Sequence, residues 1–266
     1  MWQGEPLVVR EALRSINYDP CPLPSINYFE KRLQSATILA ENKIPAVVFG
    51  HDALFCAFEV PYEWSYTLQL LVAEEDLERA ALTLLAELQT YARYPAPPNS
   101  RFGDLRPEDT PRRFMLDEIS HPPEALATSV CLRSVQPPPV TSPDSPYHAP
   151  SYIILTPSSF FNFDISNIAN TKSLPGFPPG ILFPTLIPLL DSLSEAQISP
   201  NLEYQWQGVL LFDRLAEHVF PDAEVYRRKE DIPAPVKSIS KLLKGPTQET
   251  LEECFMMIGP EREEEE

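Results

Sequence analysis

The sequence predicts an α+β fold with an α/β-like core, in which a small mixed sheet is flanked by helices and followed by a helical C-terminal part. Three observations lead to this class. Two short runs at 46–49 and 66–72 are apolar at odd and even positions, which is typical of strands buried on both faces. A long amphipathic stripe begins at Leu77. Beyond residue 180 the patterns are mainly helical.

The first predicted element is a helix over residues 25–41, because its apolar residues recur at spacings of four, three and four. A buried strand follows at 46–49. Gly50 then turns the chain into a short helix, which must end before Pro61 because proline disfavours helical backbone at the residue that precedes it.

The next predicted strand spans residues 66–72. Three acidic residues at 74–76 precede a helix over 77–91, and negative charge is favourable at the start of a helix. The apolar residues of this helix recur at i, i+3, i+4, i+7, i+8, i+11 and i+14. They form one face, which we expect to cover the sheet.

Prolines divide the middle of the chain. Of 31 prolines, fourteen lie between positions 95 and 157. Since proline cannot donate a backbone hydrogen bond, we expect loops at 94–123 and 136–150. Shorter strands are predicted at 113–116, 128–133 and 152–155.

These elements suggest a core over residues 25–160, a helical region over 180–258 and a solvated acidic tail over 259–266, which reads PEREEEE from Pro260. The helices expected in the C-terminal region lie at 182–193, 202–220, 235–243 and 249–257.

The composition excludes several classes of protein. The net charge of −17 repels a phosphate backbone, so binding to nucleic acid is not expected. The N-terminus lacks the apolar segment of a signal peptide, and no apolar run is long enough to span a membrane. The four cysteines are widely spaced, as reduced core thiols are. We therefore expect an intracellular, soluble protein, with the cytoplasm as its location.

The segment that begins IPAVVFGHDALF and continues to TLQLLV resembles the core of the nucleotidyltransferase superfold. Members of that superfold have an apolar strand, Gly-Ser or Gly-Gly, a helix, and then Asp-x-Asp on the next strand. Gly50 retains the glycine, and His51 stands where the serine is usual. Thr67 and Gln69 stand at the two aspartate positions. These four residues are the candidates for a vestigial nucleotide-binding site.

The resemblance implies chemistry that depends on two divalent ions held by carboxylates. Thr67 and Gln69 are neutral and poor ligands for magnesium, and no residue between 65 and 72 is acidic. The third carboxylate is expected on a later strand, and the strand at 128–133 offers none. We therefore assign no catalytic residue, no metal ligand and no cofactor. The stretches GHDAL and VAEEDLERA are also similar to uncharacterised fungal proteins that have no assigned activity.

Two functional hypotheses remain. The leading one is a catalytically inactive nucleotidyltransferase-like protein that binds a nucleotide weakly or interacts with a protein partner. The alternative is an active metal-dependent nucleotidyltransferase, with Mg²⁺ as cofactor, whose carboxylates come from Asp104, Glu108 or Asp109. The acidic residue that follows His51 is Asp52, which we interpret as a first-turn residue stabilised by the helix dipole.

Overall fold

The structure is a computed structural model of the 266-residue chain. It describes residues 7–9, 11, 29–60, 67–94, 129–135, 149–197, 208, 211–212, 214–215 and 234–249. The predicted strand at 113–116, most of the helix at 202–220, the helix beyond 249 and the acidic tail lie outside these ranges. So do nearly all of the two proline-rich loops.

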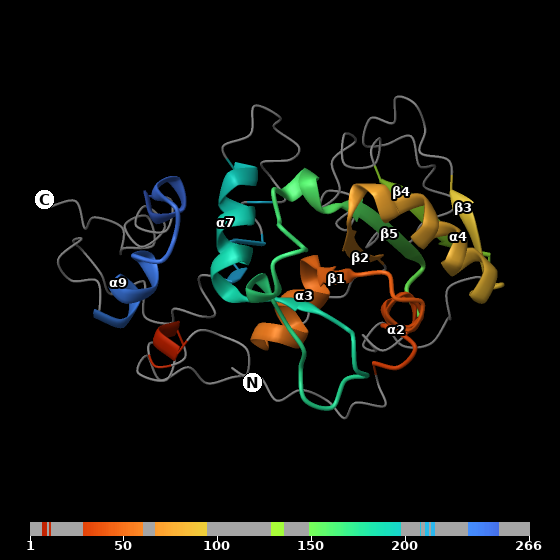
Figure 1. Cartoon of the computed structure of the whole chain (residues 1–266), viewed down its shortest axis with the longest axis horizontal. Coiled ribbons are helices and arrows are strands. Elements are labelled where there is room, and N and C mark those ends of the chain that lie inside the picture. The colour runs from red at the N-terminus through yellow and green to blue at the C-terminus, as the bar shows by residue number, and fades with distance from the viewer. Residues whose placement is uncertain are drawn as a thin grey trace, which may run out of the picture.

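The described elements confirm the α+β class, since a five-stranded mixed sheet is flanked by helices (Figure 1). In chain order they are α2 (Gln34–Glu41), β1 (Ala46–Phe49), α3 (Gly50–Phe58), β2 (Thr67–Val72), η2 (Glu74–Asp76), α4 (Leu77–Glu87), β3 (Tyr91–Tyr94), β4 (Val130–Ser134), β5 (Tyr152–Pro157), η4 (Ser158–Phe161), η5 (Ile168–Asn170), β6 (Thr171–Lys172), β7 (Phe183–Pro184), α7 (Leu186–Gln197) and α9 (Ala234–Ser240). Helices α7 and α9 form the C-terminal helical part, and α9 lies at the opposite end of the molecule from β3 (Figure 1).

The order of strands in the sheet is β1-β2-β5-β4-β3. Only the β2–β5 pair is parallel; β1–β2, β5–β4 and β4–β3 are antiparallel. The two strands predicted at 46–49 and 66–72 are therefore neighbours in one mixed sheet. The outer edge of β1 is covered by the segment before β7, because the amide of Val48 donates a hydrogen bond to the carbonyl oxygen of Leu182.

The two faces of the sheet carry different clusters. Successive side chains of a strand point to opposite faces, and one face packs against α4, as its apolar stripe predicts. The buried residues of this interface are Leu68, Leu70, Leu132, Ile153, Leu155, Ala80, Ala81 and Leu84. A separate small cluster on the other face contains Cys131, Tyr152 and Ile154, with Tyr94 packed against it.

The predicted N-terminal helix is shorter than expected. Residues 29–33 form turns, and α2 begins at Gln34. Arg32 lies in these turns and is buried against α3 and β2, which the apolar periodicity does not predict.

The helix predicted over 77–91 is also too long. Helix α4 ends at Glu87, and Tyr91 begins β3 instead of closing the apolar stripe. In β3, Tyr91 lies opposite Ser134 of β4, and its hydroxyl donates a hydrogen bond to the carbonyl oxygen of Pro150. Pro150 is itself buried, so the end of the expected 136–150 loop belongs to the packed structure.

The helix predicted over 182–193 begins later, at Leu186, because Phe183 and Pro184 form β7 and pair with β6. Pro188 then falls in the first turn of α7, where a missing backbone N–H does not break the helix. The strands predicted at 128–133 and 152–155 exist as β4 and β5, with bounds shifted by two residues or fewer.

Candidate functional site

The turn between β1 and α3 requires a glycine. Phe49 is extended, with φ −130° and ψ 177°, and Gly50 then has φ of +65°, in the left-handed region that side chains rarely adopt. A side chain at this position would also be tightly packed. A Cβ atom on Gly50 would lie 3.2 Å from Oε1 of Gln69 on the neighbouring strand. Gly50 is thus fixed by its backbone conformation and by its contact with β2.

The structure brings three of the four predicted site residues to this corner of the sheet. Gln69 lies directly opposite Phe49 in the β1–β2 ladder, next to Gly50. Thr67 is two positions earlier in β2 and points to the same face as Gln69. Both are buried, with exposed fractions of 7% and 3%. His51 lies half-buried in the first turn of α3.

The side chain of Gln69 belongs to a neutral hydrogen-bonded chain. Its Nε2 donates to Oγ1 of Thr156, and Oγ of Ser129 donates to the same Thr156 oxygen, each at 3.3 Å. Amide and hydroxyl groups thus stand at the positions for which the sequence resemblance implies carboxylates. The carboxamide approaches the Gly50 turn on one side and bonds to β5 on the other.

The strand at 128–133, which the sequence analysis noted to lack a third carboxylate, is β4 and is not adjacent to β2. The adjacent strand is β5, which pairs in parallel with β2 and reads YIILTP, so it also lacks an acidic residue. All six residues of β5 are buried, and a continuous apolar run of this kind is the sequence signal of such a central strand.

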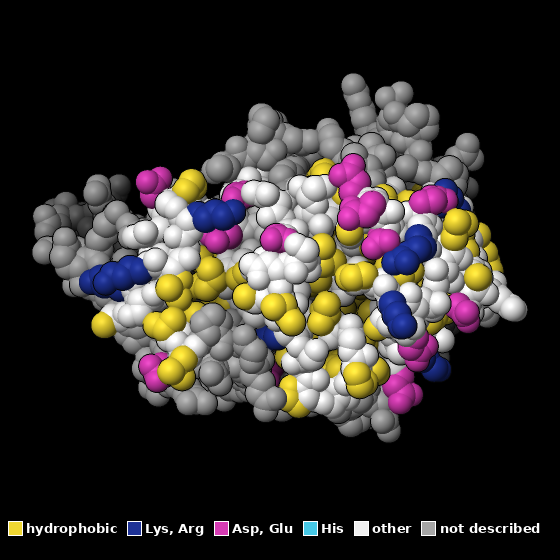
Figure 2. Space-filling model, viewed as in Figure 1, with side chains coloured by type: hydrophobic (Ala, Val, Ile, Leu, Met, Phe, Trp, Pro, Cys, Tyr) yellow, Lys and Arg dark blue, Asp and Glu magenta, His cyan; other side chains and the backbone are white. Residues whose placement is uncertain are grey.

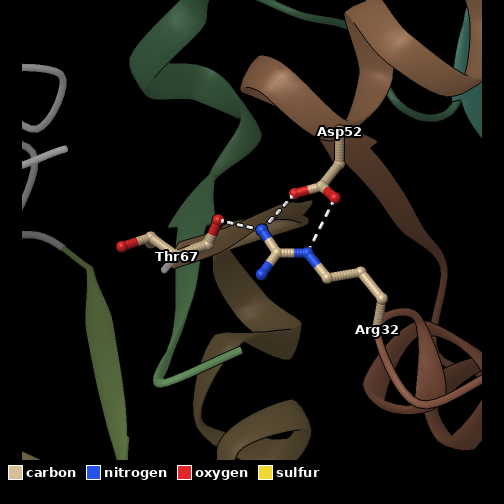
Figure 3. A network of polar contacts seen from close by, with 3 residues as sticks. All are labelled: Arg32, Asp52 and Thr67. Carbon is tan, nitrogen blue, oxygen red and sulfur yellow. Dashed lines mark hydrogen bonds and ion pairs between the residues drawn. The ribbon is translucent and has the colours of Figure 1, made fainter. Parts of the chain in front are cut away.

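A buried ion pair beside this corner was missed by the sequence analysis (Figure 3). Nε and Nη2 of Arg32 each donate a hydrogen bond of 2.8 Å to one carboxylate oxygen of Asp52. Nη2 also donates to the backbone oxygen of Thr67 at 2.7 Å. The side chains of Arg32 and Asp52 are 3% and 2% exposed. The interpretation of Asp52 as only a dipole-stabilised residue was therefore incomplete, since no spacing rule links residues that lie 20 positions apart.

The two cysteines near the sheet, Cys56 and Cys131, are buried free thiols. Burial raises the pKa of Cys56 in α3 well above its ordinary value, the negative charge of Asp52 raises it further, and the charge of Arg32 lowers it. Burial also raises the pKa of Cys131 in β4 to about 12. Because the thiolate is the reactive form, both cysteines remain protonated and unreactive at neutral pH. This agrees with their prediction as core thiols.

The C-terminal end of α3 carries a second buried cation that the sequence did not suggest. Nζ of Lys172 in β6 donates to the carbonyl oxygen of Ala57 at 3.3 Å and lies 4.4 Å from the ring centroid of Phe58. A positive charge is favourable at this end of a helix. Glu59 ends the helix with φ of +58°, and burial raises its pKa.

Metal-ligating residues do not gather anywhere in the described ranges, where no three Asp, Glu, His or Cys side chains are placed to hold an ion. Asp104, Glu108 and Asp109, the acids of the alternative hypothesis, lie outside those ranges. Among the described helices, none has the length and apolar character needed to cross a membrane. On the face drawn in Figure 2, basic side chains lie beside acidic ones and form no continuous stripe. Comparison with protein-family models, curated proteins and solved structures finds no match to this chain.

Proposed function

We propose that this protein is a catalytically inactive, nucleotidyltransferase-like binding or interaction protein that works inside the cell, in the cytoplasm. The observation that carries the proposal is the chemistry of β2 at the Gly50 turn. Thr67 and Gln69 are neutral and buried there, and Gln69 is engaged with Gly50 and Thr156. A site that holds two divalent ions needs negatively charged oxygen ligands, and the side chains of Thr67 and Gln69 do not supply them.

The arrangement of the core supports the resemblance behind this proposal. Strand, glycine turn, helix and strand follow one another, and both strands are neighbours in one mixed sheet with a helix on its face. The order β1, Gly50, α3, β2 also brings the glycine turn against the second strand. The net charge of −17 directs the search for partners towards proteins and small molecules and away from nucleic acids.

The test is an assay of pyrophosphate release. Purified protein is incubated with Mg²⁺ or Mn²⁺ and each nucleoside triphosphate, and we expect no release above the blank. Thermal denaturation with ATP, with and without Mg²⁺, reports binding separately, because a ligand stabilises the folded state by RT ln(1 + [L]/Kd). A weak nucleotide ligand raises Tm equally in both conditions, whereas a protein that only interacts with another protein shows no shift.

Metal-dependent turnover by the unmodified chain would overturn the proposal. If that turnover disappears when Asp104, Glu108 or Asp109 is replaced, the alternative of relocated carboxylates is correct. The matched gain-of-charge variant is Thr67→Asp combined with Gln69→Asp. We expect it to acquire an Mg²⁺-dependent change in Tm but little turnover, because β5 supplies no further carboxylate.

A further inference from the structure

The buried guanidinium of Arg32 contacts the two segments of the chain that carry the candidate site residues Gly50 and Gln69. It bonds to Asp52, which is two residues after Gly50, and to the backbone of Thr67, which is two residues before Gln69. One side chain thus holds both segments whose contact defines the corner, the first turn of α3 and the start of β2 (Figure 3).

We infer that Arg32 is the positioning residue of this site. Its guanidinium fixes the distance between Gly50 and Gln69 by holding Asp52 and the backbone of Thr67. The inference rests on the proposed function for treating that contact as the functional corner. The geometry of the ion pair itself is independent of that function.

The place that Arg32 fills is shaped for a guanidinium. Nε and Nη2 lie on one edge of the planar group and meet the two oxygens of Asp52 side by side. The same Nη2 extends to the oxygen of Thr67. A lysine carries its charge at a single point and cannot span this fork, so Arg32→Lys preserves the charge and loses the geometry. This separates positioning from simple neutralisation of Asp52.

Both side chains are almost entirely buried, so the loss of Arg32 leaves the Asp52 carboxylate without its ion-pair partner in a poorly solvated environment. We expect Arg32→Ala to lower Tm by roughly 10 °C, and Arg32→Lys to lose at least half as much. The matched control is Arg79→Ala, because Arg79 also pairs with an aspartate, Asp76, but its side chain is 55% exposed. This control should shift Tm by about 2 °C or less.

The specific readout is the contact itself. In the full-length protein, NMR should show a nuclear Overhauser effect between the Hα protons of Gly50 and the Hβ protons of Gln69, whose Cβ would lie 3.9 Å from a Cβ atom on Gly50. This cross-peak should weaken or vanish in folded Arg32→Lys at low temperature, where general loss of stability has no effect on the folded population. An unchanged cross-peak would overturn the inference and leave Arg32 with a merely structural role.

Chemical rescue tests whether the space beside Asp52 requires a planar guanidinium. Methylguanidinium at about 20 mM, far below denaturing concentrations of guanidinium, is added to Arg32→Ala, with methylammonium at the same concentration as the control. Only methylguanidinium should raise Tm, by a few degrees, and neither cation should raise it in the double variant that also carries Asp52→Asn. If Arg32→Ala does not fold, the inference is tested by comparing the stability of Arg32→Lys with that of the unmodified protein. Stability of Arg32→Lys equal to that of the unmodified protein, or equal rescue by both cations, would show that charge alone matters. None of these measurements uses a nucleotide, so their failure is distinguishable from failure of the proposed function.

Discussion

Replacement of Gly50 by alanine tests the glycine turn directly. A residue with a Cβ at φ of +65° carries a conformational cost of about 1–2 kcal/mol. The added Cβ also meets Oε1 of Gln69 at 3.2 Å, so a buried side chain must shift by a few tenths of an ångström. Overpacking of a tight interior costs about 1–3 kcal/mol. We therefore expect Gly50→Ala to destabilise the protein by about 2–5 kcal/mol.

Urea denaturation followed by circular dichroism measures this change in the free energy of unfolding. Gly245→Ala is the matched control, because this glycine is exposed and a Cβ there meets nothing within 4 Å, so the free energy of unfolding should change by no more than about 0.5 kcal/mol. In the double variant Gly50→Ala, Gln69→Ala, the close contact between the new Cβ and Oε1 of Gln69 is removed. The double variant should therefore be less stable than Gln69→Ala alone by only the conformational cost of the positive φ. A change below about 0.5 kcal/mol for Gly50→Ala, the level of ordinary surface substitutions, would refute this account of the turn.

Two further predictions concern α4 and the end of α3. Leu84→Ala should cost about 2–5 kcal/mol because Leu84 is fully buried, whereas Leu82→Ala, 57% exposed on the same helix, should change the free energy of unfolding little. Equal losses for both leucines would contradict the packing of α4 on the sheet. Burial raises the pKa of Glu59 above 4.5, so the folded state holds this proton more tightly than the unfolded chain does. Stability should then fall as pH rises from 4.5 through the pKa of the folded state, and Glu59→Gln should lack this decrease in urea titrations. The same slope in both proteins would show that Glu59 does not cause it.

Elements whose side chains repeat with a clear period could be predicted from the sequence. The buried strands β1 and β2 and the helix α4 follow from local patterns. Both strands lie close to their expected bounds, and α4 begins at Leu77 as predicted but ends earlier than expected, at Glu87. Tyr91 fits the helical period as well as it fits a strand. Only its pairing with Ser134 of β4, more than forty positions away, decides for the strand. Local periodicity carries no information about such a partner.

The candidate site also contains residues that the sequence predicts and one that it does not. Gly50, Thr67 and Gln69 could be found by their order along the chain, and the structure places them at one corner. Arg32 could not, because a charged residue in an amphipathic segment is ordinarily solvent-exposed. Its burial depends on a fork-shaped acceptor set assembled from two other segments, and only the folded arrangement reveals it.

The parallel pairing of β2 with β5 has a consequence for how the chain folds. Gln69 and Thr156, which bond across this pair, are 87 positions apart, so the centre of the sheet closes a long loop. The entropy of that closure must be lost before the pairing contributes stability, and non-local pairing of this kind slows folding. During synthesis β2 cannot pair with its parallel partner until β5, which ends at Pro157, has emerged. The stage most exposed to aggregation is therefore expected while the residues between β2 and β5 are being made.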